Sequence, residues 1–288
     1  MNRTSTPSVA RQSGGDSPEH APDPSLSAAT LAGEPSPTSA GSGVWPVIAV
    51  VALMTVAVQA MSYVFPPYIV PPVPEIMNSL VEIFSEYGSD MVDSIIRFAV
   101  AILAAMLGGW LIGLLMSLQR TIGRLGEAFF RLVLATPALS IMVFAVLWFR
   151  GIELRIFFVA FTLAVPFYVI AVYEAVKGLD RGLVDAVQQF RPTRWQMLRL
   201  VLIPYTVSHL IMTTKSIASF TLRIIVFAEV IAATSGVGSA IVEAQANFRT
   251  DRIFAWTVVL VAFSFVMLAT VDQLERVLLR WRPENSIG

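Results

Sequence analysis

The sequence predicts an all-α protein that is embedded in a membrane and crosses it about six times. Of its 288 residues, 56% are hydrophobic and 14% are charged, whereas soluble domains carry about 25% charged residues. Its mean hydropathy is +0.70. A helix needs about 20 apolar residues to cross roughly 30 Å of hydrocarbon. Six stretches meet this requirement, at approximately residues 45–65, 92–118, 127–149, 155–175, 205–232 and 254–275.

The segment before the first span is rich in Ser, Pro, Ala, Thr and Gly and shows no apolar periodicity. It cannot bury enough surface to offset the entropy lost on ordering, so we expect it to be disordered. It is also too long and too weakly basic to begin a signal peptide. We therefore expect a disordered tail at residues 1–43, a transmembrane domain at residues 44–282 and a short tail at residues 283–288.

Between the first two spans, the prolines of residues 66–74 exclude a helix. Residues 75–87 follow, with an apolar stripe formed by Ile76, Leu80, Ile83 and Phe84. This spacing predicts an amphipathic helix on the outer membrane surface.

Small residues and a proline shape the second and third spans. Gly109 and Gly113 have the G-x-x-x-G spacing that lets two helices approach closely, and Gly108 adjoins them. We favour packing within one subunit over contact between two subunits. Pro137 lies inside the third span, where it should kink or break the helix.

Arginine and lysine predict the orientation. If the N-terminus is inside, the inner loops and tails carry most of the cations outside the spans. The outer side then has only Arg150, Arg155, Arg249 and Arg252. Because cytoplasmic loops carry an excess of these residues, we expect both termini and the loop at residues 176–204 in the cytoplasm.

The 176–204 loop is a charged, amphipathic interruption between apolar spans. Its apolar residues form two helical stripes, one before and one after the break at Arg191-Pro192; they are Leu183, Val184, Val187 and Phe190, then Trp195, Leu198 and Leu202. Thr193 and Gln196 have the spacing of a capping box. We expect two short helices joined by a tight turn, with Pro204 marking the start of the next span.

This loop resembles the EAA loop of the membrane subunit of bacterial ABC importers. The resemblance rests on Asp185-Ala186-Val187, Arg194-Trp195-Gln196 and Leu202-Ile203-Pro204. It implies that the first helix of the loop docks into a groove of a cytoplasmic ATPase. The coupling residues implied are Asp185, Ala186, Val187, Phe190, Arg191, Arg194, Trp195 and Gln196. The alternative is an amphipathic helix that rests on lipid headgroups without a protein partner.

One position departs from the family pattern. The family usually has Gly where this chain has Arg191. Gly adopts a left-handed turn at no steric cost, whereas a residue before proline is pushed toward extended geometry. We therefore expect this turn to be built differently.

The resemblance extends from about residue 66 to about residue 281 and points to the nitrate, sulfonate and taurine branch of these permeases. It is carried by Tyr68-Ile-Val-Pro-Pro, Ser94-Ile-Ile-Arg97, Leu147-Trp148-Phe149, Ala228-Glu229, Ser235-Gly236-Val-Gly238 and Phe248-Arg249-Thr250-Asp251. It implies a bacterial inner-membrane complex of two permease subunits and two ATPase subunits, fed by an extracytoplasmic binding protein. The outer loop before the last span would dock that protein, through Gly236, Gly238, Phe248, Arg249 and Asp251.

Four ionisable residues fall inside or at the edge of spans: Arg97, Lys215, Arg223 and Glu229. A charge at the centre of the bilayer costs about 2.5 to 3.5 kcal/mol, so each should face a pore, a partner or an opposite charge. Lys215 lies near enough to the cytoplasmic end to reach the interface. The six residues between Arg223 and Glu229 rotate by about 240°, so these two do not pair along one helix.

By resemblance, the third and fifth spans border the translocation pathway. The candidate lining residues are Thr136, Pro137, Ser140, Ser219, Thr221, Arg223 and Glu229. For Arg223, the hypothesis is a pathway that tolerates an anion. The alternative is a structural salt bridge to another span.

Several chemistries are excluded. The chain has no cysteine, His20 and His209 lie in unrelated settings, and no phosphate-binding loop of the form G-x-x-x-x-G-K-[ST] occurs. The zero net charge argues against nucleic acid as a partner. We therefore expect no cofactor and no catalysis. The resemblance implies a permease subunit for a small, anionic solute such as nitrate, a sulfonate or taurine. The alternative is a stand-alone secondary transporter or channel, which should show inverted repeats and paired carboxylates at mid-bilayer.

Overall fold

The computed structural model describes residues 45–179, 182, 186–187 and 189–278. The predicted tails at residues 1–43 and 283–288 lie outside these ranges, as does Asp185. The structure divides into two units, one ending at Val51 and one starting at Ala52. Within the described ranges, every regular element is a helix, which confirms the predicted all-α class.

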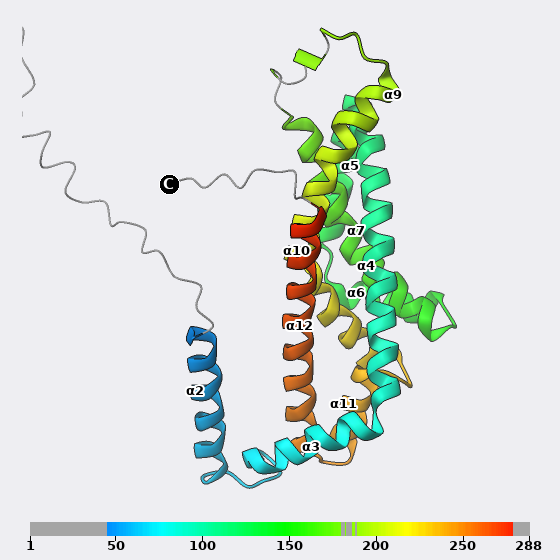
Figure 1. The fold of residues 1–288 in the computed structure, drawn as a ribbon. Coiled ribbons are helices and arrows are strands. Elements are labelled where there is room, and N and C mark those ends of the chain that lie inside the picture. Colours follow the sequence, from blue (N-terminus) through cyan, green and yellow to red (C-terminus); the bar gives the residue numbers. More distant parts are fainter. Residues whose placement is uncertain (1–44, 180–181, 183–185, 188, 279–288) are drawn as a thin grey trace, which may run out of the picture. The chain divides into compact units, whose positions relative to one another are not determined.

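The helices follow the predicted order along the chain (Figure 1). They are α2 (Trp45–Ser62), α3 (Val73–Glu86), α4 (Gly88–Ser117), α5 (Arg120–Ala135), α6 (Ala138–Trp148), α7 (Ile152–Lys177), α9 (Arg194–Met197), α10 (Ile203–Ala232), α11 (Val237–Ala246) and α12 (Thr250–Leu278). Five helical stretches of the described chain are long and apolar enough to cross a membrane, and α5 with α6 makes a sixth if the pair is one broken span.

α4 and α7 pack together more closely than side chains would ordinarily allow. A Cβ atom at Gly109 would lie 2.4 Å from Cβ of Tyr168, and one at Gly113 would lie 2.8 Å from Cβ of Val172. Only glycine lets the two backbones approach this far. The favoured interpretation of the glycine stripe, packing within one subunit, is confirmed.

The helix of the predicted third span is interrupted at Pro137, as expected. α5 and α6 meet at an angle of 92°. Thr136 has an extended backbone with ψ 129°, because a residue before proline is excluded from the helical region. α5 begins at Arg120, ahead of the predicted boundary at residue 127.

One expectation about prolines was confirmed and one was wrong. Pro204 lies in the first turn of α10, as predicted, although the helical run already begins at Trp195. A π-helical turn at Leu198–Leu202 precedes Pro204 and opens the backbone at the point where the proline ring would clash with a carbonyl oxygen. The expectation for Pro74 was wrong, because this residue is helical and lies in the first turn of α3, where no N–H donor is needed.

α3 is the predicted amphipathic helix, and it runs crosswise to α12 (Figure 1). Ile76 and Ile83 are buried in a small core with Val237 and Trp256. Phe84, on the predicted apolar stripe, is instead 62% exposed. The apolar face of α3 thus packs against the first turns of α12, the last span.

Candidate functional site

The second helix of the 176–204 loop starts with the predicted capping box. The Thr193 N–H donates to Oε1 of Gln196 at 2.8 Å, and the Gln196 N–H donates to Oγ1 of Thr193 at 3.3 Å. Both donors would otherwise be unsatisfied at a helix start. The start of α9 is therefore fixed by two side chains that the sequence had identified.

The turn before this helix corrects an expectation. Arg191 has φ 48°, so its backbone adopts the left-handed conformation that Gly adopts freely. The expectation that the proline would push Arg191 toward extended geometry was therefore wrong, and this turn carries the steric cost of a Cβ atom in a left-handed conformation.

The described part of the loop presents aromatic side chains to the surroundings. Phe190 is 87% exposed and Trp195 is 65% exposed. Ala186 and Gln196 are also exposed, and Val187 is half-buried. Arg194 lies at the start of α9. Large apolar side chains left uncovered on a charged loop are typical of a protein-binding surface.

A groove of about 620 Å³ runs between α10 and α12 and contains two of the predicted pathway residues. Arg223 and Ser219 line it from α10, and Thr257 and Ser264 line it from α12. The Arg223 Nε–H donates to the Ser219 carbonyl oxygen at 3.1 Å. Among the described residues, no carboxylate pairs with Arg223, so the alternative of a salt bridge to another span finds no partner there.

The structure does not bring the seven predicted pathway residues onto one surface. Thr221 and Glu229 are buried at 1% and 0% exposure, away from the groove face of α10. Thr136, Pro137 and Ser140 lie at the break between α5 and α6. Lys215 pairs with Asp272 at 2.5 Å and with Glu275 at 3.5 Å, which is a structural role.

Glu229 is one of three charged residues in an ion-pair network that sequence reasoning missed. Nη1 of Arg97 donates to Glu229 at 2.8 Å, and Nη2 donates to Glu153 at 2.6 Å. Arg97 is only 8% exposed, and a buried charge needs compensation. Two carboxylates from two other helices provide it. The available signal was the presence of opposite intramembrane charges at Arg97 and Glu229, near the outer ends of their predicted spans.

The same network holds the start of α11. Both oxygens of Glu229 accept from Ser94 Oγ at 2.7 and 2.8 Å, and one also accepts from the Gly238 N–H at 3.0 Å. The Gly236 N–H donates to Asp90 at 2.7 Å, with φ 104° at Gly236. Gly236 and Gly238 are buried, and any Cβ atom there would clash with the Glu229 side chain. Their docking role stays a prediction, whereas their packing role is explicit.

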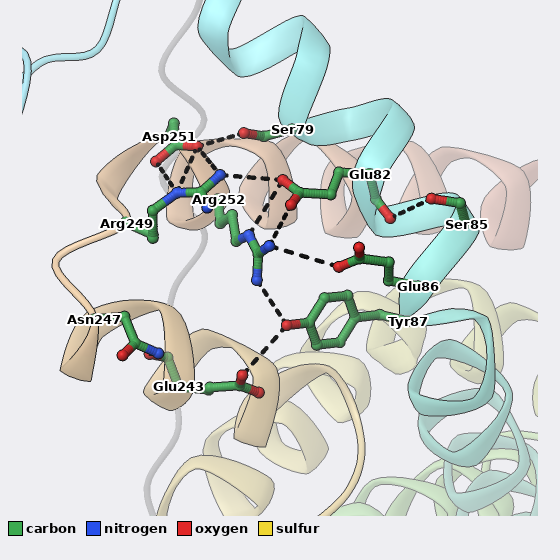
Figure 2. Close-up of polar contacts among 10 residues, drawn as sticks. All are labelled: Ser79, Glu82, Ser85, Glu86, Tyr87, Glu243, Asn247, Arg249, Asp251 and Arg252. Atoms are coloured by element: carbon green, nitrogen blue, oxygen red, sulfur yellow. Dashed lines mark hydrogen bonds and ion pairs between the residues drawn. The ribbon is translucent and has the colours of Figure 1, made fainter.

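A second polar cluster joins α3 to the start of α12 (Figure 2). Glu82 accepts from Arg249 at 3.0 Å and from Arg252. Arg249 also pairs with Asp251 at 2.8 Å, and Asp251 accepts from Ser79 at 2.5 Å. The hydrogen bond from Arg252 is the main cause that lowers the pKa of Glu82 below its usual value of 4.5.

Phe248 projects beside this cluster. It is 83% exposed and has φ 54°, in the left-handed region that bulky residues rarely adopt. Arg249 and Asp251 are engaged within the chain, as Figure 2 shows. Of the five residues predicted to dock a binding protein, Phe248 is therefore the one that the structure leaves most exposed.

Comparisons with known proteins agree with this architecture. The family model described as "Binding-protein-dependent transport system inner membrane component" matches residues 101–281. The chain is 25% identical over 226 residues to the taurine transport system permease protein TauC of Escherichia coli K12, covering 76% of this chain and 82% of that protein. It is 24% identical over 190 residues to a putative aliphatic sulfonates transport permease protein SsuC of Bacillus subtilis 168, covering 66% and 68%.

Two solved structures share the fold. One is the MetNI methionine ABC transporter in inward facing conformations, with a TM-score of 0.55, 17% identity, and coverage of 68% of this chain and 98% of that chain. The other is an amino acid ABC transporter with histidines, with a TM-score of 0.52, 19% identity, and coverage of 71% and 97%. Since the family model spans more than half of its residues, the chain belongs to the family of binding-protein-dependent transport system inner membrane components.

Proposed function

We propose that this chain is the membrane-spanning permease subunit of an ATP-driven importer, working as a homodimer with two cytoplasmic ATPase subunits and an extracytoplasmic binding protein. The observation that carries the proposal is the 176–204 loop, whose described part exposes Phe190 and Trp195 next to a capped helix start that is continuous with α10. A partner that grips this loop acts directly on a helix long enough to cross the bilayer. Force from ATP-driven closure of the ATPases therefore has a rigid path into the spans.

The proposal places the two exposed aromatic regions on opposite faces. The excess of positive charge supports a cytoplasmic position for the 176–204 loop and both termini. Phe248 lies beyond the far end of α10 and therefore faces the binding protein. Asp185, Ala186, Val187, Arg191, Arg194 and Gln196 complete the proposed ATPase contact.

The test is a pair of matched variants, Phe190→Ser and Phe248→Ser, in the assembled complex. Each removes one exposed aromatic side chain without disturbing a buried contact. Phe190→Ser should reduce co-purification of the ATPase about tenfold or more, because central aromatic anchors in interfaces contribute about 2 kcal/mol or more. Phe248→Ser should retain the ATPase and lose stimulation of ATP hydrolysis by the binding protein.

At equal membrane abundance, each variant should therefore lose one interaction and keep the other. Full ATPase retention and normal uptake with both Phe190→Ser and an Asp185→Lys variant would refute coupling through the loop. Uptake into membrane vesicles should also depend on ATP hydrolysis. Uptake that follows an imposed proton gradient in the absence of ATP would establish the competing secondary transporter.

We further propose that the solute is a small anion and that it passes the groove between α10 and α12. Arg223 provides an exposed cation with no carboxylate partner among the described residues, and Ser219, Thr257 and Ser264 add hydroxyl groups. The relatives named for taurine and aliphatic sulfonates support an anionic sulfonate group as one candidate. Thr136, Pro137 and Ser140 remain candidates for another part of the pathway.

Uptake kinetics at matched abundance test this role. Arg223→Ala should raise KM or abolish uptake, and Arg223→Lys should retain partial activity because it keeps the charge but loses the planar fork. Arg150→Ala, which removes an exposed arginine outside the groove, is the control. Unchanged uptake kinetics in both Arg223 variants would contradict a role of Arg223 in solute passage.

A further inference from the structure

α5 (Arg120–Ala135) has three distinct faces. Gly123 and Gly126 form the packing face, against Tyr173 of α7 and Met116 of α4. An apolar stripe is left uncovered, with exposures of 51%, 69%, 59% and 69% for Ile122, Leu125, Phe129 and Leu132. At 100° per residue, the charged stripe of Arg120, Arg124, Glu127 and Arg131 lies about 150° from the apolar stripe. One side of α5 therefore suits an apolar environment, and the nearly opposite side suits a polar one.

Contacts along α5 show that it crosses α7 and does not run beside it. Gly123 packs on Tyr173, and Arg131 pairs with Glu174 at 3.3 Å. Leu134 lines a small pocket with Phe167 and Ala171. From Gly123 to Leu134 the helix axis advances about 16 Å, whereas its partners on α7 shift by only about four residues, or about 6 Å. α5 therefore lies mainly across the end of a spanning helix, and the 92° bend at Thr136 turns the chain into α6.

The charged stripe contains two cations that have no ion-pair partner within the described part of the chain. Arg131 is engaged by Glu127 and Glu174. Arg120 and Arg124 are exposed and form no ion pair among the residues that the structure describes. Both lie at the start of α5, beside the end of α4 that leads into it. Since the end of α7 that Gly123 contacts leads into the 176–204 loop, these cations lie at the same membrane face as that loop.

We propose that α5 lies in the plane of the membrane interface, with its apolar stripe in the acyl chains, and that Arg120 and Arg124 bind the headgroup phosphates of anionic phospholipids. The arrangement fits this partner because one side of the helix is cationic and the opposite side is apolar, which an aqueous or a fully apolar environment would each penalise. Anionic lipid attracts each such cation by about 1 kcal/mol, or about fivefold in binding. The inference rests on membership of a membrane-protein family and not on the proposed import function.

The first test measures depth in the bilayer. Because the chain has no cysteine, single spin labels at Leu125→Cys, Phe129→Cys and Leu132→Cys report without background. In nanodiscs, their relative accessibility to oxygen and to a water-soluble nickel chelate should give nearly equal depths just below the headgroups. Labels at Val258, Val261 and Phe265 of the spanning helix α12 are the matched series, and should differ by about 10 Å from first to last. A comparable depth gradient along α5 would overturn the proposal.

The second test measures lipid selectivity. Detergent-solubilised complex is equilibrated with a 1:3 mixture of phosphatidylglycerol and phosphatidylcholine, and bound lipid is counted by native mass spectrometry. Arg124→Gln should lower retained phosphatidylglycerol about fivefold and leave phosphatidylcholine unchanged. Arg150→Gln, which removes an exposed cation elsewhere, should leave both unchanged. Equal retention by Arg124→Gln and wild type, or a disulfide between two copies through Phe129→Cys, would overturn the proposal; the disulfide would assign the stripe to a protein contact.

Discussion

Glu229 is fully buried, so its carboxylate oxygens need hydrogen-bond donors that the fold supplies. Arg97, Ser94 and the Gly238 N–H provide those donors from α4 and α11. A buried charge with this many partners is stable, whereas removing one charge leaves the other poorly compensated. The residue predicted to line a pathway therefore has a structural role, since it holds α4, α10 and α11 together.

We predict that Glu229→Gln lowers the stability of the protein by about 3 kcal/mol, near the lower end for breaking a buried pair, because Glu153 still pairs with Arg97. Glu153→Gln should cost about 1 kcal/mol or less, since the Glu153 side chain is 70% exposed. Thermal unfolding in one detergent measures both. Equal unfolding midpoints for the two variants would contradict the assignment.

Arg191 shows how a residue type can conflict with its backbone. A left-handed conformation costs a residue with a Cβ atom about 1–2 kcal/mol. We predict that Arg191→Gly retains or improves ATPase co-purification and that Arg191→Val weakens it. Both variants remove the same charge, so a difference between them reports the backbone. If Arg191→Val performs as well as Arg191→Gly, the left-handed turn is not needed for coupling.

At the scale of elements, the contact of α4 with α7 depends on missing side chains. We predict that Gly109→Ala destabilises the protein by about 1–3 kcal/mol, because its new Cβ atom would lie 2.4 Å from Tyr168 Cβ. Gly108→Ala is the adjacent control, since the nearest atom there is at 3.4 Å and alanine favours the helix. Unfolding midpoints decide, and equal effects of the two substitutions would contradict this packing.

The connection of α3 to α12 should depend on acid. The pKa of Glu82 is lowered in the folded protein, so Glu82 contributes stability that is complete above pH 4.5 and is lost as pH falls through its folded pKa. We predict faster amide hydrogen exchange in α3, after correction for the intrinsic rate, as pH falls below 4.5 and through the folded pKa of Glu82. Glu82→Gln should show the same exchange at pH 7, and Glu75→Gln, exposed on the same helix, should not. No difference between these variants would exclude the proposed role of Glu82.

At the scale of the whole molecule, one continuous helical run separates the two exposed aromatic loops. From Trp195 to Ala232 it is 38 residues, or about 57 Å, which exceeds the thickness of a bilayer. We predict that Phe190→Cys and Asn247→Cys react with an impermeant thiol reagent from opposite sides of sealed vesicles. The absence of native cysteine removes any background. Labelling of both from the same side would contradict the proposed orientation.

The sequence predicted more of the fold than of the candidate site. Hydrophobic length located the spans, Pro137 located the bend, and Thr193 with Gln196 located the start of α9, because each of these depends on local chain chemistry. Arg97 and Glu229 were recognised as costly charges, but their pairing was not predicted because they lie 132 residues apart. Arg191 was misjudged because its left-handed φ overrides the extended preference of a residue before proline.

The sequence by itself determined the class of protein, the number of candidate spans, and the existence of an amphipathic loop, since apolar length and periodicity follow directly from residue order. Only the tertiary structure decided which polar groups meet. It separated Arg223 in the groove from Thr221 and Glu229 in the interior, and it set α5 across α7. The physical reason is that burial and charge pairing depend on contacts between distant segments, which no local pattern specifies.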